Sequence, residues 1–205
     1  MNVSGSHFVL TLALAVAGVL GVARPAAAQD GTDLQFFLGV DTAAALFGDY
    51  EESPGDDVDD VDFSWLVCGG VRYGYVGASF GYVDFGELKA RGPANGGFDD
   101  EIDYDGYTLV AHGFLPIGER FVLTAEGGAL FWDQRVRYAD ALGSFRADET
   151  GVSGVVGVGA GYQIVPTMGI SLTFRYSHFF DVGDARETGH DSDIDRIGFG
   201  VAVGF

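Results

Sequence analysis

Apolar and polar residues alternate strictly along residues 195–205. Every second position is apolar: Ile197, Phe199, Val201, Val203 and Phe205. The residues between them are arginine, glycine or alanine. A period of two indicates a β-strand, and a uniformly apolar face is typical of a strand in a membrane barrel, where that face contacts lipid. We therefore predict that this segment is a transmembrane strand.

Seven segments upstream repeat this alternation. They cover residues 35–47, 63–73, 75–84, 106–115, 121–132, 152–164 and 170–180. Each is close to the roughly 9–11 residues that a tilted membrane strand needs. Strands can cross a bilayer only when they close on themselves, because lipid satisfies no backbone hydrogen bonds. The pattern predicts an all-β fold, an eight-stranded antiparallel up-and-down transmembrane β-barrel.

The connections between these segments alternate in length. Short ones lie around residue 74 and at 116–120 and 166–169, and long ones at 48–62, 84–105, 133–149 and 181–195. Short periplasmic turns and long outer loops are typical of outer-membrane barrels. The four long connections hold 25 of the 30 acidic residues and 6 of the 11 basic ones, so we expect the net charge of -19 to lie in loops on the outer rim. A soluble β-sandwich, the alternative, would spread its charges along the strands.

The N-terminus predicts export. Residues 8–22 are continuously apolar, and Ala26, Ala27 and Ala28 precede Gln29. This arrangement indicates a signal peptide over residues 1–28, followed by a barrel domain over residues 29–205. A single anchoring helix is the alternative, but this stretch is short for a membrane span. The strong negative charge argues against nucleic acid as a partner, and Cys68 is expected to be a small strand residue.

Strand parity also predicts the lining of the barrel. The inward positions include charged and polar residues: Asp41, Arg72, His112, Glu126, Gln163, Arg175 and Arg196. Unpaired ions in a narrow interior are costly, so we expect a network of salt bridges. Eight strands leave an interior that side chains can just fill. A charged gate across a narrow leak path is the alternative interpretation.

No catalytic residue, metal site or cofactor is expected. Ser177 and His178 are adjacent on a strand, so they point to opposite faces and cannot form a nucleophile–base pair. His190 and Asp191 could suggest an acid/base pair, but no further group of catalytic residues in the sequence supports them. The acidic clusters at 56–60 and 191–195 could bind calcium, but the second departs from the EF-hand loop that it resembles, since Arg196 and Ala202 stand at its two defining positions. Weak divalent bridging to lipopolysaccharide phosphates is the expected role of these acids.

Three stretches together resemble the eight-stranded transmembrane domain of OmpA-like outer-membrane proteins. Residues 75–82 resemble the third strand of that domain, and residues 107–116 and 126–132 resemble its fourth and fifth strands. Its final part is resembled by residues 175–176, 182–185 and the last strand. The resemblance implies periplasmic termini and a polar network inside the barrel. It also implies insertion by the outer-membrane barrel assembly machinery, with Ile197, Phe199, Val201, Val203 and Phe205 as the assembly signal.

This chain departs from the family inside the barrel. The family's inward glutamate and lysine correspond to Ser79 and His112, so we expect a network wired differently, around Glu126, Arg72 and Arg175. The chain ends at the barrel, so a cell-wall tether is not expected. We predict a monomeric, non-enzymatic outer-membrane protein in contact with lipid and lipopolysaccharide, with a structural or surface-interaction role. The alternatives are a narrow porin and a surface receptor or adhesin that uses the acidic loops.

Overall fold

The computed structural model describes residues 34–48, 57–92, 98–184 and 190–205, without the side chains of residues 184, 190 and 191. The expected signal peptide at 1–28 lies outside the described residues. In these four ranges no helix is both long enough and apolar enough to span a membrane.

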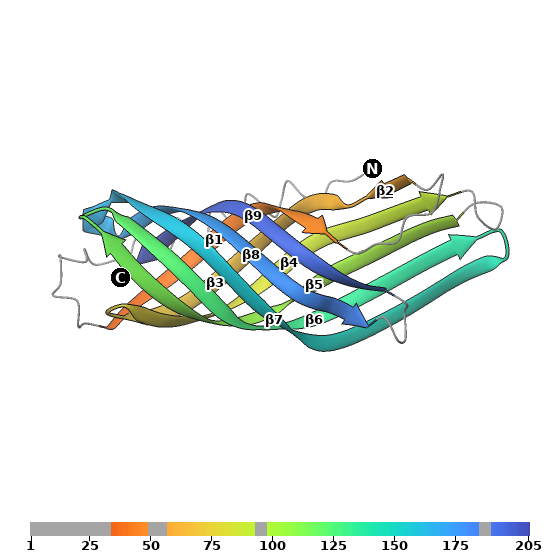
Figure 1. Ribbon diagram of the computed structural model, residues 1–205, viewed down its shortest axis with the longest axis horizontal. Coiled ribbons are helices and arrows are strands. Elements are labelled where there is room, and N and C mark those ends of the chain that lie inside the picture. Colours follow the sequence, from red (N-terminus) through yellow and green to blue (C-terminus); the bar gives the residue numbers. More distant parts are fainter. Residues whose placement is uncertain (1–33, 49–56, 93–97, 185–189) are drawn as a thin grey trace.

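Within the described residues, eight long antiparallel strands close into a barrel (Figure 1). Each pairs with the next, and the last pairs back with the first, with Phe37 opposite Gly204 and Phe47 opposite Ile194. The predicted eight-stranded up-and-down barrel is therefore confirmed. The strands are β1 (Leu34–Phe47), β3 (Val61–Tyr73), β4 (Val76–Gly92), β5 (Phe98–Ile117), β6 (Phe121–Asp140), β7 (Gly143–Val165), β8 (Ile170–Asp184) and β9 (His190–Gly204).

The two ends of the barrel differ. At one end, called here the turn end, strands are joined by short turns at Gly74 and Gly118 and by the 3-10 helix η2 (Pro166–Met168). Gly74 and Gly118 have positive φ angles of 58° and 66°, which glycine adopts without steric cost. The opposite end, called the extended end, carries β2 (Asp57–Asp59) and the far ends of β4–β7 (Figure 1).

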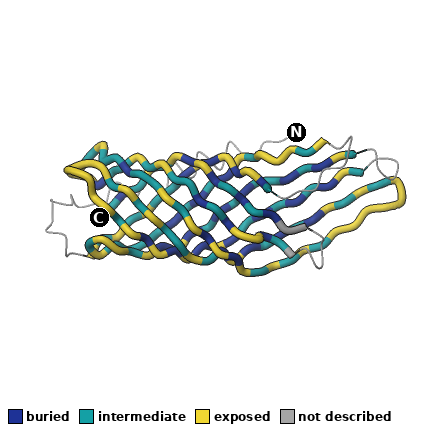
Figure 2. The backbone as a smooth tube through the Cα atoms, in the orientation of Figure 1, coloured by how far each residue is buried: buried dark blue, intermediate teal, exposed yellow. Residues whose placement is uncertain are grey.

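Burial alternates along the strands as the sequence predicts. Exposed and buried positions follow one another along the tube in Figure 2, and buried positions are concentrated in its middle and extended parts. The exposed set includes the large apolar residues Phe36, Phe80, Leu109, Val158 and Phe199. A continuous apolar outer surface is the feature that lets a closed barrel sit in lipid.

Four strands continue well past the segments predicted for them. β4 pairs with β5 as far as Gly92 opposite Phe98, and β5 pairs with β6 as far as Phe98 opposite Asp140. The β6–β7 hairpin closes at Asp140 opposite Gly143. We call residues 85–92, 98–105, 133–140 and 143–154 the extension. The predicted long loops at 84–105 and 133–149 were therefore wrong, because most of their residues are paired strands.

The neighbouring strands stop short and leave the extension with two edges. β3 pairs with β4 only up to Trp65 opposite Asp84, and β2 then covers part of the β4 edge, with Asp57 opposite Arg91. β8 pairs with β7 from Val155 opposite Phe179 onward. Among the described residues, the backbone of β7 therefore pairs with β6 alone over residues 143–154, although the Ser153 hydroxyl still donates to the Asp181 carbonyl of β8 at 2.8 Å. A bulge at Asp181, whose φ is 45°, marks the departure of β8.

Candidate functional site

An ion network crosses the barrel interior near its middle. Arg196 on β9 forms an ion pair with Asp41 on β1. Arg175 on β8 lies 3.6 Å from an Asp41 oxygen and 3.6 Å from an oxygen of Glu126 on β6. His112 Nδ1 on β5 lies 3.5 Å from the same Glu126 oxygen. Five strands thus supply two carboxylates, two guanidinium groups and one imidazole to a single cluster.

Hydroxyl groups complete the hydrogen bonding of this network. Ser177 Oγ donates to Glu126 at 2.7 Å, and Arg196 Nε donates to Ser64 Oγ at 2.8 Å. Ser79 Oγ and His112 Nε2 are 2.7 Å apart. The Arg196 side chain is 1% exposed and that of Glu126 5%. Buried ions of this kind require such partners, since an uncompensated buried charge is strongly destabilising.

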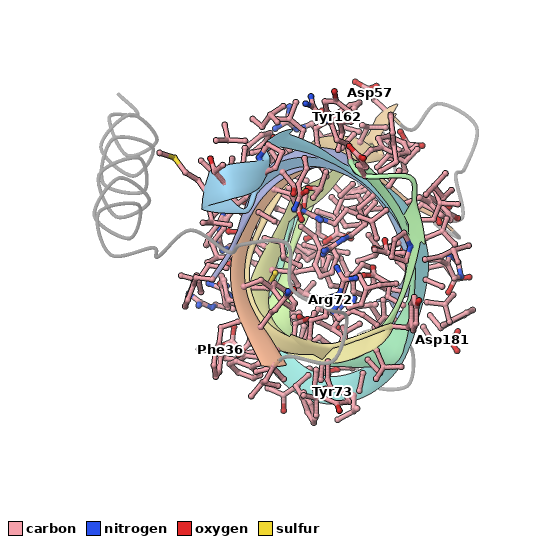
Figure 3. The ribbon with its side chains drawn as sticks, turned by 90° about the vertical axis from the view of Figure 1, so that its left-hand side faces the viewer. Phe36, Asp57, Arg72, Tyr73, Tyr162 and Asp181 are labelled. Atoms are coloured by element: carbon pink, nitrogen blue, oxygen red, sulfur yellow. The ribbon has the colours of Figure 1, made fainter. Side chains whose placement is uncertain are left out.

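The structure brings together five of the six predicted lumen residues: Asp41, His112, Glu126, Arg175 and Arg196. Arg72 also lies in the lumen but is placed apart from this cluster, toward the turn end (Figure 3). Its Nε donates to the Gly74 carbonyl at 2.8 Å, and its guanidinium stacks 4.6 Å from the Phe114 ring centre. Asp41 instead contacts two arginines, since it pairs with Arg196 and lies 3.6 Å from Arg175.

A second, apolar layer fills the lumen beside the network, toward the extended end. The sequence pattern did not predict this layer, because the strands that form it have apolar residues on both faces. Examples are the neighbours Leu66–Val67, Leu109–Val110 and Leu130–Phe131. The buried cluster includes Phe47, Leu66, Phe85, Leu88, Ile102, Tyr104, Leu130, Val136, Phe179, Val182 and Ile194. Its ring contacts include Phe85 edge-on to Phe179 at 4.8 Å between centres. The lumen toward the extended end is therefore packed like the core of a soluble domain.

A cavity of about 10 Å³ remains between the two layers. It is lined by residues of both, among them Val110, Phe179, Glu126 and Arg175. A volume of about this size admits at most a single water molecule. The network and the apolar layer therefore pack closely against each other at this depth of the lumen.

The outer face of the extension carries paired charges in place of the loop charges that the sequence predicted. Arg137 on β6 reaches Glu101 at 3.1 Å and Asp103 at 3.0 Å, both on β5. Arg135, one pair nearer the membrane, binds Asp105. Burial raises the pKa of the Asp103 carboxyl, and the positive charge of Arg137 partly offsets that shift. The acidic rim is thus a cross-strand lattice of opposite charges, each pair of modest strength at the surface.

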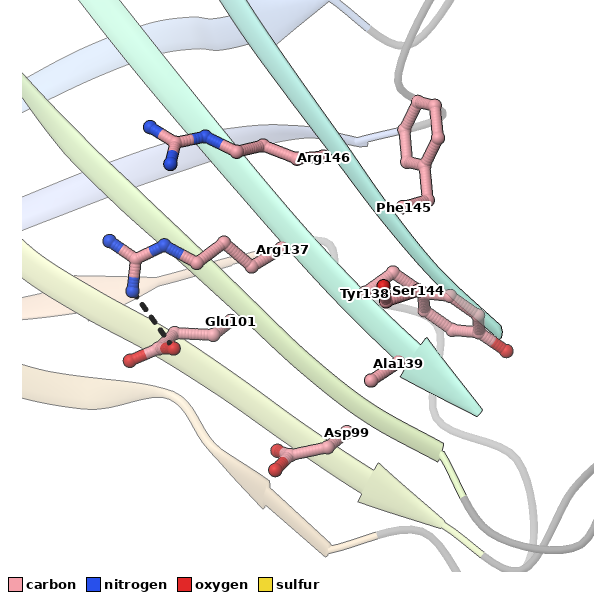
Figure 4. A pocket seen from close by; sticks show the side chains of 8 residues that line it. All are labelled: Asp99, Glu101, Arg137, Tyr138, Ala139, Ser144, Phe145 and Arg146. Carbon is pink, nitrogen blue, oxygen red and sulfur yellow. Dashed lines mark hydrogen bonds and ion pairs between the residues drawn. The ribbon is translucent and has the colours of Figure 1, made fainter. Parts of the chain in front are cut away.

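A shallow cleft of about 350 Å³ lies near the tip of the β6–β7 hairpin (Figure 4). Arg137 and Arg146 stand directly opposite each other in the register of β6 and β7, and Glu101 and Asp99 line the neighbouring side. The hairpin itself is tied by Asp140, whose Oδ1 accepts from the backbone N–H groups of Leu142 at 2.8 Å and Gly143 at 3.0 Å. The tip is therefore a defined hairpin that presents charged side chains.

The rejected catalytic pair is separated as expected. Ser177 points inward to Glu126, whereas His178 Nδ1 lies 2.9 Å from Asp195 Oδ1. The side chains of His190 and Asp191 lie outside the described part of the structure. No group of three or more histidine, cysteine, aspartate or glutamate residues suited to a metal ion occurs among the described residues. Cys68 is a buried, free cysteine in the lumen.

Four of the five predicted assembly positions on the apolar face of β9 are exposed. Ile197, Phe199, Val201 and Phe205 are exposed, and Phe205 stacks on Phe36 with ring centres 6.4 Å apart. Val203 is buried, with an exposed fraction of 5%. The Phe205 backbone is held on β1, because its N–H donates to the Phe36 carbonyl at 2.8 Å.

The family model of the OmpA-like transmembrane domain matches residues 32–205. The chain belongs to this family. The OmpA-like transmembrane domain is an outer-membrane β-barrel, and the apolar belt and closed sheet of this chain have the form that such a location requires. No curated protein matches the chain.

Solved structures share the fold of this OmpA-like barrel at low identity. The Neisserial surface protein A (NspA) is 14% identical over 83% of this chain and 97% of its own, with a TM-score of 0.52. Ail of Yersinia pestis, solved with the heparin analogue sucrose octasulfate, is 13% identical over 84% and 97%, with a TM-score of 0.50. The Escherichia coli protease OmpT is 8% identical over 85% and 96%, with a TM-score of 0.40, which is too low to support an argument.

Proposed function

We propose that this protein is a closed, non-enzymatic outer-membrane barrel whose role is envelope structure or surface contact. The observation that supports this most is the two-layer filling of the lumen. The ion network and the apolar layer leave about 10 Å³ between them, and a hydrated ion needs a continuous path. The extension supports the surface-contact part, since it projects paired charges and a hairpin tip beyond the barrel.

The same proposal includes the topology and partners expected from the sequence. The turn end, with both described chain ends near it, would face the periplasm, and the extension would face outward. The mature barrel would be a monomer in contact with lipid and lipopolysaccharide. The barrel assembly machinery would recognise the apolar face of β9 after removal of residues 1–28.

Bilayer conductance tests the closed lumen. Purified protein inserted in planar bilayers is expected to give no reproducible conductance steps above those of protein-free membranes, because the lumen is filled at two levels. The narrow porin predicts reproducible steps, changed by Glu126→Ala and Arg175→Ala, which remove a carboxylate and a guanidinium from the network. Steps of that kind would contradict the proposal.

Deleting Phe205 tests the assembly signal. We expect the truncated protein to fold in detergent with an unfolding midpoint close to that of the parent, because one residue at the end of β9 is lost. Insertion into membranes by the assembly machinery should fall several-fold. Leu172→Ala, which removes another lipid-facing side chain near the turn end, is the matched control. An equal loss in detergent and in assembly would show that Phe205 is only a lipid-facing residue.

A further inference from the structure

Beyond the end of β8, the backbone of β7 has a strand neighbour on one side only within the described residues, and Ser153 Oγ, which donates to the Asp181 carbonyl at 2.8 Å, marks where contact with β8 ends. Residues 143–154 pair with β6 on one side, and β8 begins to pair with β7 only at Val155. Along this edge Ser144, Phe145, Arg146, Asp148 and Thr150 are exposed. Alternate backbone N–H and C=O groups along such an edge point away from the sheet and can pair with a further strand.

The side chains of this edge are complementary to themselves. Register with Arg137 and Arg135 places Arg146 and Asp148 on the outer face of β7. In an antiparallel pairing of two such edges centred on Ala147, each Arg146 faces the other copy's Asp148. Ser144 then faces Thr150 of the other copy on the same face. Opposite charges and hydroxyl pairs directly across two strands are favourable, whereas like charges are not.

We propose that the β7 edges of two copies of this chain pair antiparallel about Ala147 and join two barrels into one continuous sheet. The interface is isologous, as a two-fold axis requires. The charges on an edge strand ordinarily prevent indiscriminate pairing. Here the same charges select one register and one partner, because a shift of two residues brings like charges together.

The barrel geometry places the two copies in membranes that face each other. The two-fold axis that relates two antiparallel strands is perpendicular to their sheet. A barrel wall stands upright on the membrane, so a line perpendicular to the wall is parallel to the membrane plane. The axis therefore lies in the membrane plane and reverses the direction of the second barrel. Copies in one membrane point the same way, and their edges, each tilted by about 35–45°, would cross instead of pairing.

The contact is small, since it joins about seven residues from each copy, and interfaces below about 1,000 Å² are usually weak. Many copies on two apposed membranes would bind together much more tightly than one pair. The barrel would therefore remain a monomer in dilute detergent and connect membranes only where it is dense. This inference rests on the surface-contact role proposed above and names its partner.

Cysteine cross-linking tests the register. In a Cys68→Ser background, Ala147→Cys lies on the two-fold axis and should form a disulfide between copies. Two populations of phosphatidylcholine vesicles, one holding an epitope-tagged chain, are mixed and mildly oxidised. We expect dimers that contain one tagged and one untagged chain. Ala139→Cys, exposed one strand away from the edge, should give at least several-fold fewer.

Charge reversal tests the partner. Arg146→Asp and Asp148→Arg each place like charges across the edge, so vesicles bearing either variant alone should cluster no more than protein-free vesicles. Mixing the two populations restores opposite charges at both contacts, and clustering should return to the parent level. Unchanged mobility shifts on heating in detergent electrophoresis would show that both variants fold.

Three outcomes would overturn the pairing: equal cross-linking at 139 and 147, clustering that ignores the charge reversals, or cross-links formed only within one vesicle population. If the barrels neither pair nor conduct, the pairing is overturned and the proposal of a closed lumen stands. Conductance steps in a barrel that does cluster vesicles would instead contradict the closed lumen alone.

Discussion

Replacing Asp41 with asparagine is expected to lower the free energy of unfolding by about 3–5 kcal/mol, because it leaves the buried Arg196 without a carboxylate partner, whereas Arg175 keeps Glu126. Asp41 pairs with Arg196, whose side chain is 1% exposed, and lies 3.6 Å from Arg175. The amide keeps the shape of the side chain and removes its charge. Urea titration of the folded barrel in detergent micelles, followed by tryptophan fluorescence, measures the change.

Glu126→Gln is the matched comparison. Arg175 then still has Asp41, and Ser177 can still donate to the amide oxygen, so the expected loss is smaller, roughly 1–3 kcal/mol. Asp41 is therefore the residue on which the network depends. Equal losses in the two variants would contradict this, and so would an unchanged urea midpoint for Asp41→Asn.

Gly200→Val is expected to destabilise the barrel by about 3 kcal/mol or more, or to prevent its closure. Gly200 stands opposite Asp41 where β9 meets β1. A Cβ atom there would lie 2.4 Å from the Val40 carbonyl oxygen and 2.5 Å from the Asp41 Cβ. Both are atoms of the neighbouring strand, so the clash is relieved only by moving that strand.

Gly204→Val is the control on the same strand and the same face. Its nearest neighbours would be the carbonyl oxygens of Gly169 and Phe36, each at 3.9 Å, which is ordinary contact. We expect its urea midpoint to stay near that of the parent. Heat-induced mobility shifts on gels give a second measure of closure for both variants. Similar behaviour of the two valine variants would show that the close approach at Gly200 is not limiting.

The sequence predicted the membrane-facing part of the fold because lipid demands a simple pattern. Apolar residues recur at every second position along the membrane strands. Phe36, Phe80, Leu109 and Phe199 are examples from four strands, and each is exposed in the structure. The ends of β4–β7 were harder to predict. Glu87, Lys89, Asp103 and Arg137 alternate with Leu88, Ile102 and Val136, and the charges made these strands resemble loops.

The interior was predicted only where it is charged. Asp41, Glu126 and Arg196 stand out against glycine and alanine, so parity alone assigned them to the lumen. Parity gave no depth along the barrel axis, and Arg72 was therefore grouped with residues that lie nearer the middle. Leu66, Val110 and Leu130 sit between apolar neighbours, and period-two alternation cannot show that they face inward.

The two strands that close the barrel constrain the order in which it can fold. Each other neighbouring pair in the barrel joins strands that follow one another, whereas β1 and β9 lie roughly 150 residues apart in the chain. The length-dependent part of loop-closure entropy is about 4 kcal/mol for such a separation, against about 1.5 kcal/mol for a hairpin of a few residues. The hairpins can therefore form at little entropic expense, and the contact of Asp41 with Arg196 becomes available only when the chain ends meet.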